Sequence, residues 1–147
     1  MLNKSLIYAT DFNSVIIEEA KNGIYSNKSY IVAQENFSKI GIKYNLADSV
    51  SENDSYVIIN EEIKKKILFF QHNLVEDSSF NEFDIIICKN VVIYFDNHLQ
   101  KKVFQLFYDS LKFGGHLVLG ESEYIHPLFV EKFEQDNLDS KIFKKVA

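Results

Sequence analysis

The second half of this 147-residue chain contains a strand, a helix and a strand in succession, and this order restricts the fold more than any other feature. Residues 83–88 are an apolar run typical of a buried strand, and residues 97–112 repeat apolar side chains at helical spacing. A glycine pair at positions 114 and 115 is expected to end the helix before residues 116–120 return as a strand. Because such a crossover joins parallel strands, we expect an open α/β sheet.

The start of the chain predicts a second unit of strand and helix. Residues 5–9 are a nearly continuous apolar run that ends close to Asp11, as in a parallel strand buried on both faces. Asn13 or Ser14 can cap the helix that follows, and Gly23 can end it. Open α/β sheets bind ligands beyond the carboxyl ends of their strands, so the acid at position 11 lies where a ligand is expected.

The remaining segments are expected to complete a single domain over residues 1–147. Periodicity weakens between residues 24 and 63, where we expect short helices and a small antiparallel β-hairpin inserted at residues 37–63. Further strands are expected at residues 56–59, 67–70, 129–133 and 141–145, the last two as antiparallel edge strands.

Charge and cysteine content argue against several classes of function. A formal net charge of −5 argues against a protein that binds nucleic acid by neutralising phosphates, and no basic stripe is present. Cys88 is the single cysteine, so a disulfide within the chain is excluded, and its apolar neighbours predict a buried thiol rather than a nucleophile. The four histidines are scattered and have no cysteine partner, so we expect no metal site.

Hydropathy predicts a soluble protein. No apolar run approaches the roughly 20 residues of a membrane span, and the apolar stretch near the first residue is too short for a signal peptide. A single buried thiol is typical of a reducing compartment, so we expect a cytoplasmic location without membrane insertion.

Polar residues at the ends of predicted strands are the candidates for a binding site. The Asp11 carboxylate can accept both hydroxyls of a ribose, although a strand-terminal aspartate is more often a helix cap or turn residue. Asn73 offers a donor and an acceptor, as reading the edge of an adenine requires, and Leu74 can pack on the ring face. A loop asparagine that bonds its own backbone is the competing interpretation.

Two further candidates follow the strongest predicted strand. Asn90 comes directly after it and is expected to face the ligand crevice of the sheet. Tyr94 lies between Ile93 and Phe95. For this tyrosine, a core position with a bonded hydroxyl and a substrate-facing role are equally compatible with the pattern.

Four motifs, taken in order, resemble those of the CheR-type methyltransferases, which methylate glutamate side chains of chemotaxis receptors. The first joins a strand end at residues 9–13 to a helix end marked by Ala20, Gly23 and Tyr25. The other three are at residues 70–74 (FQHNL), 83–95 (FDIIICKNVVIYF) and 114–123 (GGHLVLGESE). An ordered set of this kind is specific, and it covers nearly the whole chain.

The resemblance implies a protein-glutamate methyltransferase with a Rossmann-like sheet that binds S-adenosylmethionine and releases S-adenosylhomocysteine. Six residues would contact the cofactor: Asp11 at the ribose, Asn73 and Leu74 at the adenine, Lys89 and Asn90 at the methionyl part, and Tyr94 beside the transferred methyl group as the catalytic positioning residue. The family has arginine where this chain has Lys89, which keeps the positive charge but lacks the planar fork of donors.

The same resemblance implies a truncated sheet that another polypeptide completes. Family members carry a helical domain and then a first strand with a glycine-rich turn, and neither precedes Met1 here. In the family's sheet this strand lies between the strands that end at Asp11 and Cys88. We therefore expect a partner chain or a second copy of this chain to fill the gap, and weak cofactor binding without it. A chemotaxis receptor is the expected substrate, and no nucleic acid is expected as a partner.

An alternative of a different class is a catalytically inactive remnant. It would keep the α/β core and its protein contacts as a binding or regulatory module of bacterial signalling, without turnover. Measurements of cofactor binding and methyl transfer distinguish the two.

Overall fold

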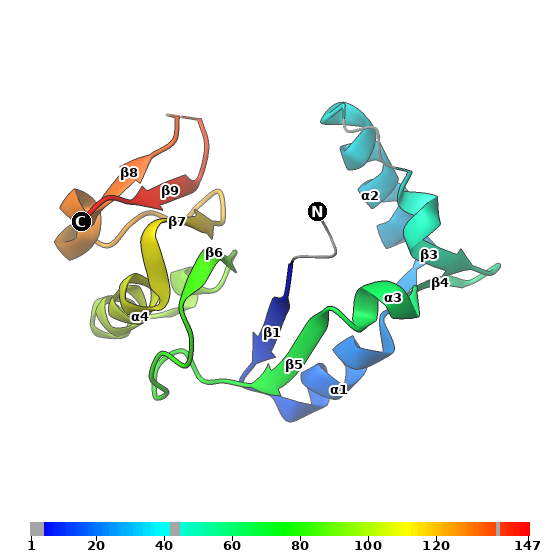
Figure 1. Ribbon diagram of the computed structural model, residues 1–147, viewed down its shortest axis with the longest axis horizontal. Helices are drawn as coiled ribbons and strands as arrows, with labels where there is room; N and C mark the ends of the chain where they lie inside the picture. Colours follow the sequence, from blue (N-terminus) through cyan, green and yellow to red (C-terminus); the bar gives the residue numbers. More distant parts are fainter. Residues whose placement is uncertain (1–4, 42–44, 138) are drawn as a thin grey trace. The chain divides into compact units, whose positions relative to one another are not determined.

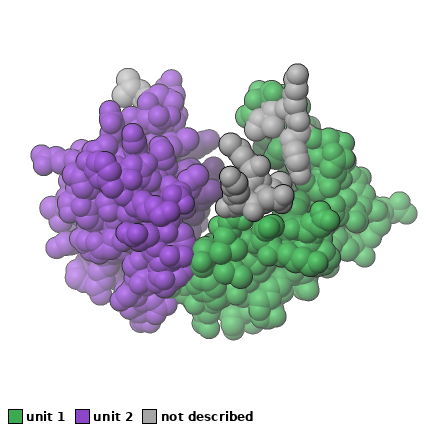
Figure 2. Space-filling model, in the orientation of Figure 1, with its two compact units in different colours: residues 1–72 green, residues 73–147 purple. Residues whose placement is uncertain are grey.

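The computed structural model describes residues 5–41, 45–137 and 139–147. The chain divides into two compact units, residues 1–72 and residues 73–147 (Figure 2).

Unit 1 is built on two parallel strands, β1 (Ile7–Asp11) and β5 (Ile67–Gln71), which pair along their whole length. The helix α1 (Ser14–Asn22) packs against both strands (Figure 1). Asn13 is its N-cap, and Gly23 ends it with a left-handed φ of 64°. The unit of strand and helix predicted for the start of the chain is confirmed, but the strand lies two residues later than the predicted 5–9 and is not buried on both faces, since Ile7 is 46% exposed.

Between α1 and β5, unit 1 carries a small antiparallel sheet and several helical segments. The sheet has the order β2-β4-β3, with β2 at Ile24–Ser26, β3 at Val50–Glu52 and β4 at Tyr56–Ile59. The helical segments are α2 (Asn27–Lys39), the 3₁₀-helix η2 (Leu46–Ser49) and α3 (Glu61–Lys64).

The hairpin of β3 and β4 lies inside the segment 37–63 named from the sequence. Asn53 makes its turn, because the side-chain oxygen accepts the N–H groups of Ser55 and Tyr56, each at 2.9 Å. Residues 37–39 belong to α2 instead, and this helix, with 13 residues, is longer than the short helices expected. Its N-cap side chain and one buried tyrosine, Tyr30, stabilise it against the sheet.

Unit 2 contains a four-stranded sheet in the order β6-β7-β9-β8 (Figure 1). Its strands are β6 (Phe83–Cys88), β7 (Leu111–Leu119), β8 (Phe133–Gln135) and β9 (Ile142–Lys145). β6 and β7 are parallel and are joined by α4 (Asn97–Ser110), while β9 runs antiparallel to both β7 and β8. The strand predicted at 141–145 is therefore antiparallel as expected, but it lies inside the sheet rather than at its edge. The predicted crossover of strand, helix and strand is confirmed.

The helix α4 is shorter than predicted, and the glycine pair does not end it. It ends at Ser110, and Leu111 already has an extended backbone with its side chain in the core. Gly114 and Gly115 lie inside β7, next to an irregularity in its pairing with β6. A Cβ on Gly115 would come within 3.1 Å of the Asp84 carbonyl oxygen, so glycine here permits two strands to approach closely.

The edge strand predicted at residues 129–133 is wrong for most of its length. A 3₁₀-helix, η4 (Pro127–Lys132), occupies the segment, and β8 begins only at Phe133. Pro127 stands at the start of the helical turn, and the ring of His126 accepts a backbone N–H there at 3.3 Å. Both features favour a helical start over a strand.

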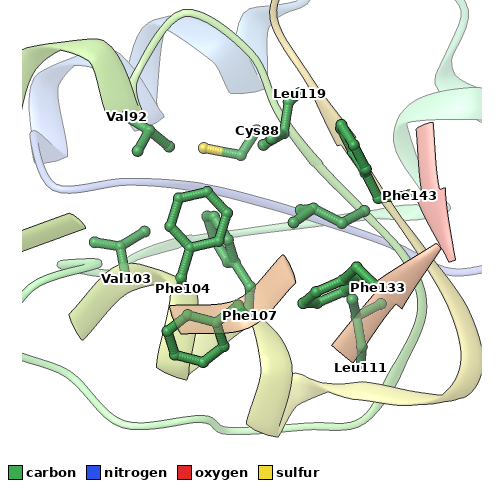
Figure 3. Packing of buried hydrophobic residues seen from close by; sticks show 11 residues of the cluster. Cys88, Val92, Val103, Phe104, Phe107, Leu111, Leu119, Phe133 and Phe143 are labelled. Atoms are coloured by element: carbon green, nitrogen blue, oxygen red, sulfur yellow. The ribbon is translucent and has the colours of Figure 1, made fainter. Parts of the chain in front are cut away.

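The core of unit 2 is formed by side chains of α4, β7 and the C-terminal segments (Figure 3). On α4, Phe104 is fully buried and contacts Phe107 and Phe129 edge-on or tilted. The rest of the buried cluster consists of Cys88, Val92, Val103, Leu111, Leu117, Leu119, Phe133 and Phe143.

Cys88 is 7% exposed within this core. Burial, and to a lesser extent the charge of Glu123, raise the pKa of its thiol to about 12. The thiolate is therefore scarce at neutral pH, and the predicted buried thiol is confirmed.

The parallel strands β1 and β6 each have an open edge among the described residues. β1 pairs with β5 alone, and β6 pairs with β7 alone. On β6, Ile85 and Ile87 are 59% and 70% exposed, while the alternate residues Ile86 and Cys88 face the core. The chain is thus a mixed α/β protein with several small sheets.

Candidate functional site

The segment after β6 forms the candidate site of unit 2. Lys89 and Asn90 are exposed beyond the end of the strand, and a short 3₁₀-helix, η3 (Val92–Tyr94), follows. Asn90 has a positive φ of 59°, a left-handed conformation that asparagine tolerates better than most residues. The chain therefore turns at the carboxyl end of β6, where ligands of α/β sheets bind.

A buried carboxylate, that of Glu123, holds this turn in place. Glu123 lies just beyond the end of β7 and is 2% exposed. Five backbone N–H groups donate to it: to Oε1 from Val91 at 2.9 Å, Val92 at 2.7 Å and Ile93 at 3.4 Å, and to Oε2 from Asn90 at 2.9 Å and Gly120 at 2.6 Å. One side chain thus ties together the ends of two adjacent parallel strands.

Two opposed effects set the charge of Glu123. Burial raises the pKa of the carboxyl, because it removes water from the charged form. The N–H donors of Gly120, Asn90, Val91 and Val92 stabilise the carboxylate and bring the pKa below its ordinary value. The side chain is therefore a carboxylate at neutral pH, and within the described ranges backbone N–H groups rather than a lysine balance its charge.

Gly120, directly after β7, lets the turn at Asn90 come close. A Cβ at this position would lie 2.5 Å from the Asn90 Oδ1, 2.8 Å from the Asn90 nitrogen and 2.8 Å from the Glu123 Oε2. Any side chain here would displace one of these groups. The side-chain amide of Asn90 thus packs over Gly120, while Asn90 itself remains exposed to solvent.

Tyr94 and Lys89 extend from the same segment. Tyr94 is 80% exposed, so the structure excludes the core position that its apolar neighbours allow. Lys89 is exposed and forms no ion pair with any described residue. Both side chains are available to a bound molecule.

Asn73 organises a turn at the start of unit 2. Its Oδ1 accepts the Val75 N–H at 3.0 Å, its Nδ2 donates to Glu76 at 3.0 Å, and its backbone N–H donates to Asp77 at 2.7 Å. These are the contacts of an asparagine that serves its own loop, although the amide keeps one N–H and one lone pair for a ligand. Leu74 packs partly buried against the core.

Asp11 ends β1 in unit 1. Its Oδ1 accepts the Asn13 N–H at 2.8 Å, as a turn residue does. No hydrogen bond to its Oδ2 occurs in the part of the chain that the structure describes, so this oxygen can accept from a ligand.

The predicted site residues fall into three places. Lys89, Asn90 and Tyr94 share the turn after β6, whereas Asn73 and Leu74 belong to another segment of unit 2. Asp11, at the end of β1, belongs to unit 1. Their common contact with one cofactor stays a prediction.

The sequence pattern does not single out Glu123 or Gly120 as site residues. Both lie in the motif at residues 114–123, but the loop that Glu123 binds is 30 to 33 residues away in the chain. Hydrophobic periodicity reports only on residues that are close together in the chain. The available signal is an acid three residues after the glycine that ends a predicted strand.

The described residues contain neither a metal centre nor a membrane helix. No group of three or more His, Cys, Asp or Glu side chains among them could hold a metal ion. In the same ranges no helix combines the length and the apolar character needed to cross a bilayer.

Comparison with known proteins decides the family. A family model, the SAM binding domain of CheR methyltransferase, matches residues 2–142. The chain belongs to the CheR methyltransferase family. The resemblance carried by its four motifs is thereby confirmed, and a CheR domain of this kind implies a Rossmann-like methyltransferase fold and S-adenosylmethionine as cofactor.

Individual members of the CheR family match along almost all of this chain. Cher3 of Pseudomonas putida is 34% identical over 146 residues, which are 99% of this chain and 54% of the relative. The chemotaxis protein methyltransferase of Vibrio anguillarum is 33% identical over 147 residues, which are 99% and 51% of the two chains. Chemotaxis protein methyltransferase 1 of Vibrio cholerae is 31% identical over 141 residues, which are 95% and 49%. The chain spans about half the length of these relatives.

Proposed function

We propose that this chain forms part of the S-adenosylmethionine site of a cytoplasmic protein-glutamate methyltransferase that acts on chemotaxis receptors. The match of residues 2–142 to the CheR SAM binding domain carries the proposal. The turn after β6 supports it, because Lys89, Asn90 and Tyr94 are exposed there on a backbone that a buried carboxylate fixes.

The adenosine end of the cofactor fits the free polar groups of two residues. The Oδ2 of Asp11 can accept a ribose hydroxyl while Oδ1 keeps its contact with the following turn. Asn73 can donate its remaining N–H and accept on its remaining lone pair, the pair of groups needed to read the edge of an adenine. Neither role requires the loss of a hydrogen bond that the structure contains.

The methionyl end fits the turn after β6. The Lys89 ammonium can pair with a carboxylate as a point charge, and the Asn90 amide can bond the amino acid part. Tyr94, with its ring exposed, can orient the reacting groups. When bound, S-adenosylmethionine supplies a methyl group on a cationic sulfur, and transfer to a carboxylate oxygen leaves a neutral thioether. No residue of the chain therefore has to donate or remove a proton.

A single Rossmann-like sheet would arise if one strand joined the two open edges. β1 and β6 each belong to a parallel pair and each lack a second neighbour among the described residues. A strand added beside either edge would lie about 4.8 Å from the strand it pairs with. We infer that a polypeptide segment outside residues 1–147 supplies it, in the same protein, in a partner chain or through a second copy.

The test measures cofactor binding and methyl transfer with and without a complementing segment. Calorimetry follows the titration of the purified chain with S-adenosylhomocysteine, and labelled methyl groups are counted on the cytoplasmic part of a chemotaxis receptor. The segment is the part of the Pseudomonas putida relative that this chain does not span. We expect poor binding and no transfer by the chain alone, and both activities after the segment is added.

Two results would contradict the proposal in different ways. Tight, stoichiometric binding by a pure monomer would remove the need for a second polypeptide. Absence of binding and of transfer in the complemented mixture would favour the inactive remnant that serves as a binding module.

A further inference from the structure

We propose that Glu123 and Gly120 are positioning residues for the cofactor, which act by holding Asn90 in a ligand-facing conformation. This inference rests on the proposed function, because it assigns a purpose to the geometry of the same turn. It concerns two residues that do not face a ligand themselves, since Glu123 is 2% exposed and its oxygens are occupied by backbone N–H groups.

The buried carboxylate of Glu123 accepts hydrogen bonds from several donors. A carboxylate without water is costly unless hydrogen bonds replace its hydration, and an ordinary helix cap needs only one or two such bonds. Glu123 accepts from four consecutive residues, 90–93, and from Gly120 on the neighbouring strand. This arrangement fixes the whole path of the turn rather than the start of the short helix η3.

The backbone of Asn90 has a left-handed conformation. Its φ of 59° lies in the left-handed region, which asparagine adopts more readily than most residues with a side chain, but a local constraint is still needed to make it the one conformation populated. The Asn90 N–H donates to Glu123 at 2.9 Å, so the carboxylate supplies part of that constraint. A turn released from Glu123 can relax to a negative φ, which would redirect the Asn90 amide.

Gly120, which has no side chain, leaves space for the side chain of Asn90. The Asn90 Oδ1 would lie 2.5 Å from a Cβ at this position, so its side chain rests on the bare glycine. The direction of the amide is thus fixed from two sides, by hydrogen bonds to its backbone and by contact beneath its side chain. An alanine at position 120 would crowd the Asn90 side chain most closely, and would also press on the Asn90 nitrogen and the Glu123 Oε2, each 2.8 Å from the added Cβ, while it leaves the charge of the carboxylate in place.

The experiment compares Glu123→Gln with Glu121→Gln, an exposed acid two residues away that serves as the matched control. Glutamine keeps the shape but turns one acceptor into an NH₂ group that faces N–H donors. Hydrogen exchange of individual amides is measured by NMR on the full chain. We expect exchange at Asn90, Val91 and Val92 to accelerate at least about tenfold in Glu123→Gln, with Leu117 and Leu119 of β7 unchanged, and no change in Glu121→Gln.

A double-mutant cycle tests whether the effect acts through Asn90. Affinity for S-adenosylhomocysteine is measured for Gly120→Ala, Asn90→Gly and the double variant, with the complementing segment present. We expect Gly120→Ala to weaken binding by about fivefold or less, and to have a smaller effect once the Asn90 amide is gone, although the close contacts of a Cβ with the Asn90 nitrogen and the Glu123 Oε2 remain. A merely structural glycine would lower affinity equally in both backgrounds.

Three results would overturn the inference. Unchanged amide exchange in Glu123→Gln would show that the carboxylate does not hold the turn, whatever the cofactor does. Faster exchange in Glu123→Gln, with unchanged affinity of this variant for S-adenosylhomocysteine, would show that Glu123 has a structural role only. Additive effects of Gly120→Ala and Asn90→Gly on that affinity would show the same for Gly120. If Glu123→Gln fails to fold, the double-mutant cycle of Gly120→Ala and Asn90→Gly alone tests the inference. Failure of the unaltered, complemented chain to bind contradicts the proposed function instead, and the exchange measurement still decides the role of Glu123.

Discussion

Asn90 combines two properties that a substitution can separate. Its backbone is left-handed, which favours asparagine or glycine, and its amide lies beside the proposed methionyl position. Glycine keeps the first property and removes the second. We expect Asn90→Gly to retain thermal stability within about 1 kcal/mol and to weaken S-adenosylhomocysteine binding by about 1 kcal/mol.

Asn90→Ala is the matched comparison, because alanine loses the amide and also opposes a positive φ. It should lower both the affinity and the melting temperature. If Asn90→Gly bound as tightly as the unaltered protein in the complemented assay, the asparagine would serve the backbone alone.

Asp11 also has two functions, so the choice of substitution matters. Alanine would remove the ribose acceptor together with the hydrogen bond to Asn13 that precedes α1. Asp11→Asn keeps a neutral acceptor for the turn and removes the charge. We expect both variants to lose cofactor affinity, Asp11→Ala by about 1.5–3 kcal/mol, while Asp11→Ala alone also lowers the free energy of unfolding. Calorimetry and urea unfolding separate the two effects, and unchanged affinity in both variants would refute the ribose assignment.

Cys88 makes stability depend on pH in the alkaline range. In the unfolded chain its thiol ionises near the ordinary pKa of 9.0, and in the fold the pKa is about 12. Between these values the unfolded state releases a proton that the folded state keeps. Stability is therefore complete below about pH 9 and falls as the pH rises, with a slope of at most about 1.4 kcal/mol per pH unit.

The measurement compares urea unfolding of the unaltered chain and of Cys88→Ala from pH 8 to pH 11. The stability advantage of the unaltered chain should shrink with rising pH, because alanine does not titrate. A thiol reagent should label native Cys88 slowly and unfolded Cys88 quickly. A constant difference between the two proteins, or fast native labelling, would contradict a buried thiol.

At the scale of elements, the sequence predicts what depends on neighbours in the chain. β6 has the predicted bounds, and α1 has the predicted capping asparagine and terminal glycine, because period and caps are local properties. Gly115 misleads as a helix stop, since its role is set by the Asp84 carbonyl on another strand. The η4 turn is missed because Pro127 outweighs the apolar run that follows. Glu123 is missed for the same reason as Gly115, since its partners come from elsewhere in the chain.

The end of α4 offers a test of a contact that joins elements. The Lys145 Nζ donates to the carbonyl groups of Tyr108 at 2.7 Å and Leu111 at 2.8 Å, and lies 4.0 Å from the centre of the Tyr108 ring. From β9 it thus satisfies one carbonyl in the last turn of α4 and the carbonyl of the residue that follows the helix. We expect Lys145→Met to lower the free energy of unfolding by about 1.5 kcal/mol.

Lys144→Met is the control, because Lys144 is the exposed neighbour on the same strand. It should change stability by no more than about 0.5 kcal/mol. The two midpoints in urea give the comparison. Equal losses in both variants would show that the cap contributes nothing beyond general charge.

For the whole molecule, local patterns predict the parallel pair of β6 and β7, but not the pairing of β1 with β5 or how either sheet continues. β1 and β6 both end in residues of the proposed site, Asp11 and the turn after Cys88, and both have an open edge among the described residues. The exposed side chains of Ile85 and Ile87 on β6 are apolar surface of the kind that a completed sheet covers with helices. If a further strand pairs with these edges, we expect the sheet and the proposed cofactor site to form together.

That coupling predicts a specific pattern of hydrogen exchange. If a strand inserts between the two edges, the unpaired N–H groups of both β1 and β6 become bonded, and their exchange should slow when the complementing segment is added. The β3–β4 hairpin is the internal control, because its pairing is already complete within unit 1 and should not change. Exchange is followed by NMR or mass spectrometry at constant protein concentration, and then over a dilution series. Protection that appears with concentration and without the segment would identify a second copy as the occupant. Protection of β1 alone or of β6 alone would show docking to one unit without a shared sheet, and unchanged exchange at both strands would rule out strand insertion.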